Sequence, residues 1–429
     1  MFLKTKINYD FKKKIIGFIF FSLITLTIYF LISKQIVYPT IVPMIKNGAI
    51  KLFADWTVIL NANLCFEKGL DVYLNNPCDP WGRRHVYGQI LLNIPFIEKL
   101  SKFYFIVFPI LINLLFIYIV INFFELENLI QYFVVLLFIF SSSVILAIER
   151  ANIDIIIFLV TIYISYNKRF IFNYIAIIFA ALSKFYPITL AFIFLFEKNF
   201  KKVMLNLIFV ITIILVIYFF QIEDIKKIFS NSKQFKAISI YNFSFDGFLY
   251  YIINLKLIIN KQDYNWLKYL ILFIVLGLPL IITLKKKLSF VFNNKNIKDL
   301  YLNNIYENRL YILSSIIILT CYFSFNNFIY REIFFLGLIP WIFKQKKITD
   351  KENFFSFYFY LLCLKFFLSS ILIFLFMNNI LYQYKALITL VKHILDLYLI
   401  LVVLIIFLSS LKSMLNNYFK TMFHKKSGT

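Results

Sequence analysis

Six charged side chains have the types needed for a reaction site, although they lie far apart in the sequence. They are two aspartates, one glutamate and three cations, namely Asp55, Glu149, Arg150, Asp154, Lys184 and Arg331. A carboxylate at a lipid–water boundary can act as a general base that takes a proton from an attacking hydroxyl. Arginine binds phosphate well, and a helix N-terminus favours the same anion. These residues therefore predict a base that faces a phosphate pocket.

Each of these residues also has a structural interpretation that involves no chemistry. Asp55 is also explained as a solvated loop aspartate. Arg150 and Asp154 are four residues apart, so they could form an ion pair that joins two helices. Lys184 could extend its amine to the lipid headgroups, and Arg331 could anchor a helix end at the interface. Spacing alone leaves both sets of interpretations open.

The composition predicts an integral membrane protein. The 429 residues are 62% hydrophobic and 15% charged, with a mean hydropathy of +0.82. A soluble domain carries more charge than this, and the residue alternation of a membrane barrel is missing. Helices are then the spanning element, because a helix satisfies its own backbone hydrogen bonds. We therefore expect an all-α, polytopic transmembrane helix bundle that forms a single domain over residues 1–429.

Apolar stretches near the length of about 20 residues that a bilayer requires predict about twelve helices. Ten full spans are expected, at residues 15–33, 103–124, 131–148, 153–166, 203–220, 266–284, 309–325, 333–343, 353–376 and 388–410. Two short helices are expected to form a hairpin within residues 170–196, because basic clusters flank both of its ends. Pro187 disfavours helix at the residue before it, which predicts a break near Lys184.

The distribution of lysine predicts how the bundle is oriented. The net charge of +24 is compatible with nucleic-acid binding, but the lysines lie in short clusters between apolar spans, as the positive-inside rule describes. We therefore expect membrane lipids and no nucleic acid as partners. Both termini and a loop at 288–308 are predicted to be cytoplasmic, and a large first loop at 34–102 to be extracytoplasmic. The six charged residues then fall on the outer side.

Four cysteines and three late charged residues are given structural roles. Cys65 and Cys78 share the first loop, where a disulfide is possible on the outer side, but spacing alone leaves this bond undecided. The other two cysteines are expected to pack inside apolar spans. The late charges are expected to pair between helices, without a catalytic role: Lys365, His393 and Asp396. No nucleotide-binding loop or metal-binding motif is present.

Three motifs together resemble glycosyltransferase family 87, the polyprenol-phosphate-mannose-dependent mannosyltransferases. The first is Ala54-Asp55-Trp56, followed by Gly69-Leu70-Asp71-Val72-Tyr73 and His85-Val86-Tyr87-Gly88. The second is Glu149-Arg150-Ala151-Asn152-Ile153-Asp154, and the third is Ala180-Ala181-Leu182-Ser183-Lys184-Phe185-Tyr186-Pro187. The resemblance covers about residues 50–200. Tyr87-Gly88-Gln89 replaces a Tyr-Pro-Pro of the family, and Ala151-Asn152 replaces its Gly-Asn.

The resemblance implies a GT-C fold and an enzyme that acts on the outer face of a bacterial cytoplasmic (inner) membrane. Its donor would be a polyprenyl-phosphate-sugar, from which a hexose, mannose in the family, passes to a lipid or glycan acceptor. Asp55 would be the catalytic base, and three cations would bind the donor phosphate: Arg150, Lys184 and Arg331. Supporting roles fall to Glu149, Asn152, Asp154, Tyr87 and Tyr186. No cofactor is expected, and the sequence leaves a need for a divalent cation open.

Two other classes of function stay open. One is a lipid-linked oligosaccharide polymerase or flippase of envelope polysaccharide assembly, which also has many spans and outer charges. A flippase should line a central path with charges at mid-membrane depth, whereas the six residues are predicted at one end of the bundle. The other class is a non-catalytic subunit of an envelope assembly complex.

Overall fold

The computed structural model describes most of the chain. It covers residues 52–424 except 125, 127, 198, 235–241, 255–262, 286–296, 298–299, 302–303, 325–326, 349–352 and 378–383, together with 14–15, 17–19, 21–23, 25–27 and 30. The first predicted span is thus described only in part, as an apolar helix between Gly17 and Thr27. The start of the first loop and most of the predicted cytoplasmic loop at 288–308 lie outside the described residues.

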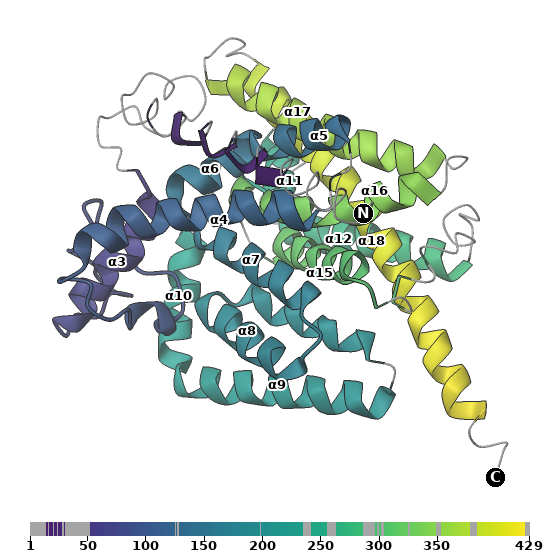
Figure 1. The fold of residues 1–429 in the computed structure, drawn as a ribbon, viewed down its shortest axis with the longest axis horizontal. Helices are drawn as coiled ribbons and strands as arrows, with labels where there is room; N and C mark the ends of the chain where they lie inside the picture. The colour runs from purple at the N-terminus through teal and green to yellow at the C-terminus, as the bar shows by residue number, and fades with distance from the viewer. Residues whose placement is uncertain are drawn as a thin grey trace, which may run out of the picture.

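Helices make up most of the described chain, which contains no strand. In order they are α3 (Ala54–Glu67), η1 (Gln89–Leu92), η2 (Phe103–Val107), α4 (Phe108–Phe123), α5 (Leu129–Ile139), α6 (Ser142–Arg150), α7 (Ile153–Tyr166), α8 (Phe170–Ser183), η3 (Tyr186–Phe196), α9 (Phe200–Phe220), α10 (Ile222–Gln234), α11 (Phe245–Asn254), α12 (Asp263–Lys285), α15 (Tyr306–Ser324), η4 (Ile329–Leu338), α16 (Ile339–Ile348), α17 (Asn353–Met377) and α18 (Lys385–His424). Figure 1 shows their arrangement.

Several of these helices are long and apolar enough to cross a membrane. Four meet both conditions on their own, at Phe103–Phe123, Phe200–Phe220, Phe354–Ile373 and Ala386–Phe419. The bent pair of α5 and α6 makes a fifth if it counts as one span. The all-helical membrane bundle is therefore supported by the described residues, whereas the predicted number of twelve helices stays a prediction.

The predicted span at 131–148 is bent in the structure, because α5 and α6 meet at an angle of 61°. Serines occupy the break. The hydroxyl of Ser141 donates to the carbonyl of Phe138 at 2.6 Å, and the amide of Ser142 donates to Ser370 Oγ on α17 at 3.1 Å. Side-chain oxygens thus replace backbone partners that a continuous helix would have supplied, which stabilises the bend.

The predicted break within 170–196 is confirmed. Helix α8 ends at Ser183, and the 3-10 helix η3 begins at Tyr186 and packs against α8. Lys184 adopts an extended conformation between them, and its amide closes the last turn of α8 by donating to the carbonyl of Ala180 at 3.0 Å. The break therefore places Lys184 between the two apolar helices and outside both of them.

Helix α15 forms the centre of the bundle and packs against η3, η4, α7 and α18 (Figure 1). Most of its residues between Glu307 and Tyr322 are buried, polar ones included. A Cβ atom on Gly337 of η4 would lie 2.0 Å from Ser314 Oγ, so glycine permits the close contact between η4 and α15. This packing makes η4 an interior element and not a short surface connection.

The first loop is a folded unit at one edge of the molecule, with α3 and α10 beside it (Figure 1). Cys65 and Cys78 are joined by a disulfide, with their Cα atoms 5.8 Å apart. Lys227 of α10 lies 2.6 Å from the Asp71 carboxylate. Asn231, also on α10, donates to the carbonyl of Tyr73 at 2.7 Å. The segment predicted as a loop therefore includes a 14-residue helix, α3, and its middle part is held by a disulfide and by contacts with α10.

Candidate functional site

Asp55 lies in the first turn of α3 and is 8% exposed. Its helix begins after Phe53, which has a positive φ of 64° and donates its amide to the carbonyl of Glu149 at 2.8 Å. The Asp55 carboxylate has a donor on each oxygen. Arg150 Nε lies 2.9 Å from Oδ1, and Asn152 Nδ2 lies 2.7 Å from Oδ2. The Asp55 carboxylate is therefore oriented and enclosed. The alternative interpretation, a solvated loop aspartate, does not describe it.

The motif from Glu149 to Asp154 forms a tight turn between two helices. Arg150 ends α6, Ala151 adopts the left-handed conformation with φ 44°, and Asn152 caps α7 by accepting the amide of Asp154 at 3.0 Å. A cap of this kind satisfies an otherwise unpaired amide at a helix start. The turn therefore holds the side chains of Arg150, Asn152 and Asp154 within one small region.

Asp154 is the second carboxylate of the site and is fully buried. Lys184 forms an ion pair with it and also lies 3.4 Å from Asn152 Oδ1. The Tyr186 hydroxyl donates to Asp154 Oδ1 at 2.6 Å, and Arg331 Nε lies 3.7 Å from Oδ2. Asn152 therefore connects the pair of Asp55 and Arg150 with the group around Asp154.

Tyrosine rings surround the ammonium group of Lys184. Its Nζ atom lies 5.4 Å from the ring centre of Tyr87, 5.9 Å from that of Tyr186 and 5.8 Å from that of Tyr330. A cation over aromatic faces is stabilised where water is excluded. Burial, with a further contribution from the charge of Asp55, raises the pKa of Tyr87, so its phenol stays neutral. Lys184 is thus enclosed by the protein and does not extend to lipid headgroups.

The Tyr87-Gly88 segment packs directly against the break after α8. Gly88 donates its amide to the carbonyl of Ser183 at 3.0 Å. A Cβ atom at this position would lie 1.7 Å from the carbonyl oxygen of Leu182, so no larger residue fits without movement of the backbone. The first loop is therefore joined to the segment that carries Lys184, and Gly88 is required for that contact.

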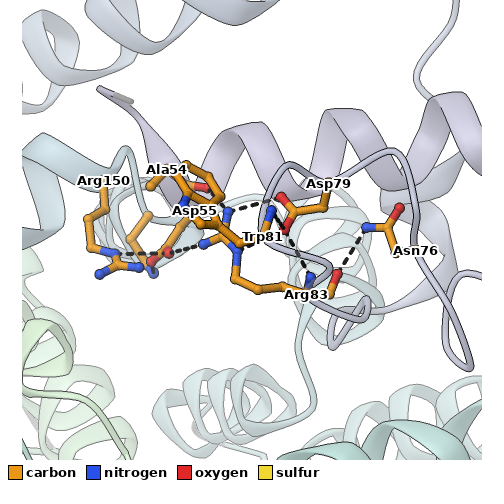
Figure 2. A network of polar contacts seen from close by, with 8 residues as sticks. Ala54, Asp55, Asn76, Asp79, Trp81, Arg83 and Arg150 are labelled. Atoms are coloured by element: carbon orange, nitrogen blue, oxygen red, sulfur yellow. Dashed lines mark hydrogen bonds and ion pairs between the residues drawn. The ribbon is translucent and has the colours of Figure 1, made fainter. Parts of the chain in front are cut away.

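Arg83 reaches Asp55 from the first loop, and it was not among the predicted site residues. Its guanidinium binds the Asp79 carboxylate through two hydrogen bonds of 3.1 Å and donates to the carbonyl of Ala54 at 3.0 Å (Figure 2). It also lies 3.9 Å from Asp55 Oδ1 and 4.3 Å from the ring centre of Trp81. Trp81 and Arg83 are partly exposed, so they form the open side of the site.

The structure brings together most of the predicted site residues, which come from four separate segments. Asp55, Arg150, Asn152, Asp154, Lys184, Tyr186 and Arg331 form one network of direct contacts, with Tyr87 at its edge. Glu149 is buried beside them and contributes its backbone carbonyl to the start of α3. Arg150 pairs with Asp55, and Asp154 pairs with Lys184, so each cation bridges two segments of the chain.

No metal site was found in the described part of the chain, where no three His, Cys, Asp or Glu side chains come together suitably. Comparisons of the sequence with protein-family models and curated proteins, and of the structure with solved structures, found no match. Membership of glycosyltransferase family 87 therefore stays a prediction that rests on the three motifs.

Proposed function

We propose that the protein is a membrane glycosyltransferase that moves a hexose from a polyprenyl-phosphate-sugar donor to a lipid or glycan acceptor. The observation that carries this proposal is the single network in which an oriented carboxylate, Asp55, pairs with Arg150 and is linked through Asn152 to Lys184 and Arg331 around Asp154. A sugar transfer from a lipid phosphate needs these two features together, namely a base for the acceptor hydroxyl and cations for the departing phosphate. Mannose is the sugar that the motifs favour.

Arg150 has a role in the mechanism because it lies between the proposed base and the cations that would bind the phosphate. In the structure it holds Asp55 Oδ1 at 2.9 Å. We expect the donor phosphate to draw this guanidinium away, because arginine binds phosphate through charge-assisted hydrogen bonds. Oδ1 is then released to accept the proton of the acceptor hydroxyl, while Asn152 still orients Oδ2. Donor binding would thereby prepare the base.

The transfer itself is a direct displacement. The acceptor oxygen forms a bond to the anomeric carbon, and the bond from that carbon to the phosphate oxygen breaks. The proton goes to Asp55, and the polyprenyl phosphate leaves with the electron pair, stabilised by Lys184, Arg331 and the displaced Arg150. A single displacement of this kind inverts the anomeric centre. Arg83 and Trp81, on the open side, lie where the acceptor would approach.

The disulfide supports an extracytoplasmic position for this site. Disulfides persist in oxidising compartments and are rare in the cytosol, and the bond between Cys65 and Cys78 lies in the same loop unit as Asp55. The lysine clusters predict the same side from the sequence. We therefore propose a reaction at the outer face of a bacterial cytoplasmic membrane, with both chain termini in the cytoplasm.

The lipid-linked oligosaccharide polymerase or flippase is the second candidate, and one observation bears on it. Charged side chains do lie deep between η4, α17 and α18, at Glu332, Lys365, Lys392 and Asp396, but each has a side chain that is 0% exposed. These charges face one another and are closed to solvent. In a flippase, charges that line a path for a glycan would be partly exposed to that path. The closed arrangement therefore favours the transferase.

The test is transfer by the purified protein in lipid nanodiscs. Radiolabelled polyprenyl-phosphate-hexoses would be incubated with lipid and glycan acceptors, with the Lys184→Met protein as the inactive control. We expect labelled acceptor with an inverted anomeric linkage from wild type alone. The same protein would also be placed in sealed vesicles, where movement of label across the membrane without any new glycosidic bond would favour the flippase. A protein that binds the donor yet transfers to no acceptor class would overturn the proposal.

A further inference from the structure

A second group of charged side chains is completely buried where η4, α17 and α18 meet, and we call it the buried quartet. It consists of Glu332 on η4, Lys365 on α17, and Lys392 and Asp396 on α18. Lys392 Nζ lies 2.7 Å from Asp396 Oδ2 and 3.5 Å from Glu332 Oε1. Lys365 contacts the Glu332 carboxylate and lies 3.5 Å from Asp396 Oδ1. Two positive and two negative groups therefore neutralise one another.

The surroundings of the buried quartet are apolar. Lys365 Nζ lies 4.5 Å from the ring centre of Phe366 and 5.1 Å from that of Phe335. Lys392 Nζ donates to the carbonyl of Asn242 at 2.7 Å. Removing four charges from water costs several kcal/mol for each ion, and well-packed apolar residues often give equal or greater stability. Stability alone therefore does not account for the quartet, whereas a requirement for one fixed arrangement does.

The element that the quartet holds also enters the candidate site. Arg331 and Glu332 are consecutive residues on η4, and consecutive residues of a 3-10 helix point about 120° apart because it has about three residues per turn. Arg331 therefore faces Asp154 at 3.7 Å, while Glu332 faces the two lysines. The ring centre of Tyr330, on the same turn, lies 5.8 Å from Lys184 Nζ. Any rotation of η4 about its axis would move both groups together.

We propose that the buried quartet is a positioning device that fixes the rotation of η4 and so presents Arg331 to the donor phosphate. Glu332, Lys365 and Lys392 are then positioning residues for the proposed transferase, and this inference rests on that function. The carboxylate of Glu332 is held by lysines from two different helices, so η4 cannot turn without breaking an ion pair. Ion pairs on one side of η4 thereby fix the position of the phosphate-binding Arg331 on its other side.

The test uses a double variant that removes one positive and one negative charge together, Glu332→Gln with Lys365→Met. Lys392 and Asp396 still neutralise each other, so no buried charge is left without a partner. The matched control is Glu307→Gln with Lys344→Met, which removes an ion pair of 2.7 Å between α15 and α16. Two quantities are measured in detergent micelles, namely the binding of polyprenyl monophosphate and the hydrogen exchange of amides 329–338.

We expect the quartet variant to bind polyprenyl monophosphate at least tenfold more weakly than wild type and to exchange faster in η4. The control variant should match wild type in both measurements. Unchanged binding in the quartet variant overturns the inference, as does an equal loss in both variants, which would indicate general destabilisation. If wild type itself does not bind polyprenyl monophosphate, the proposed donor is wrong. Hydrogen exchange then decides alone, and unchanged exchange in η4 overturns the positioning role.

Discussion

Replacing Arg150 with glutamine removes the guanidinium that lies between the proposed base and the proposed phosphate pocket. The wild-type pair has Nε 2.9 Å from Asp55 Oδ1, with side chains that are 22% and 11% exposed. Breaking a fully buried pair costs about 3–5 kcal/mol because one charge stays unpaired. Partial exposure, and the remaining contacts from Asn152 and Arg83, reduce this effect. We expect the free energy of unfolding to fall by about 1–2 kcal/mol.

The same variant should lose transfer activity through the donor. Hydrogen bonds to charged groups contribute about 1.5–3 kcal/mol, and each 1.36 kcal/mol is tenfold in rate. We therefore expect kcat/KM for the donor to fall about 10- to 100-fold. Initial rates would be measured against donor concentration in nanodiscs, and unfolding would be followed by urea titration in mild detergent.

A double variant separates the two effects of Arg150. Adding Asp55→Asn to Arg150→Gln removes the carboxylate that was left unpaired, so stability should return toward wild type while transfer stays lost. Arg150→Gln protein with wild-type stability and wild-type kcat/KM for the donor would show that Arg150 neither holds Asp55 nor binds phosphate.

Three further predictions concern the first loop. Gly88→Ala should lower both stability and transfer, measured by urea titration and initial rates, because its Cβ atom would lie 1.7 Å from the carbonyl oxygen of Leu182. Replacing Cys65 and Cys78 with serine should lower the urea-derived free energy of unfolding by about 3 kcal/mol, as expected for a closed loop of this size. Burial lowers the pKa of His85 to about 3. The stability that neutral His85 contributes should therefore be full above about pH 6.5 and decrease by about 1.4 kcal/mol per pH unit as the pH falls toward 3. The free energy of unfolding of wild type should fall with pH by this amount more than that of the His85→Phe protein.

Each of these predictions has an outcome that contradicts it. A fully active Gly88→Ala protein would mean that the loop does not need its close contact with α8. Unchanged unfolding after removal of the disulfide would show that other contacts already close the loop. Identical pH slopes for wild type and His85→Phe between pH 6.5 and 5 would show that His85 is not buried in its neutral form.

The residues of the site could largely be predicted from the sequence because charge is rare in the apolar part of this chain. Arg150, Asp154 and Lys184 interrupt stretches that are otherwise apolar, and the lysine clusters predicted which side they share. The break beside Lys184 followed from Pro187. These signals are local, so one sequence contains them. The contact of Asp55 with Arg150 joins residues 95 positions apart. The predicted topology placed both residues on the outer side, but it did not predict that they touch.

Other features could not be predicted because they depend on packing between distant segments. Arg83 is one charge among several in a polar loop, and its contact with Asp79 depends on how that loop turns. The bend between α5 and α6 depends on Ser370 of a much later helix. Lys365 and Asp396 were expected to pair between helices, and this is confirmed, but the part played by Glu332 depends on the orientation of η4.

Asp55 is proposed as the base of a sugar transfer from a lipid phosphate, and the activity of the Asp55→Asn protein shows whether it has this role. Asparagine keeps the shape of the side chain but cannot accept the proton. We predict that the rate of transfer falls about 10²- to 10⁴-fold while polyprenyl monophosphate still binds. The control is Asp71→Asn, which changes an aspartate of the same loop that pairs with Lys227 at the surface and should keep the wild-type rate. An Asp55→Asn protein that is folded and transfers sugar at the wild-type rate would show that Asp55 is not the base.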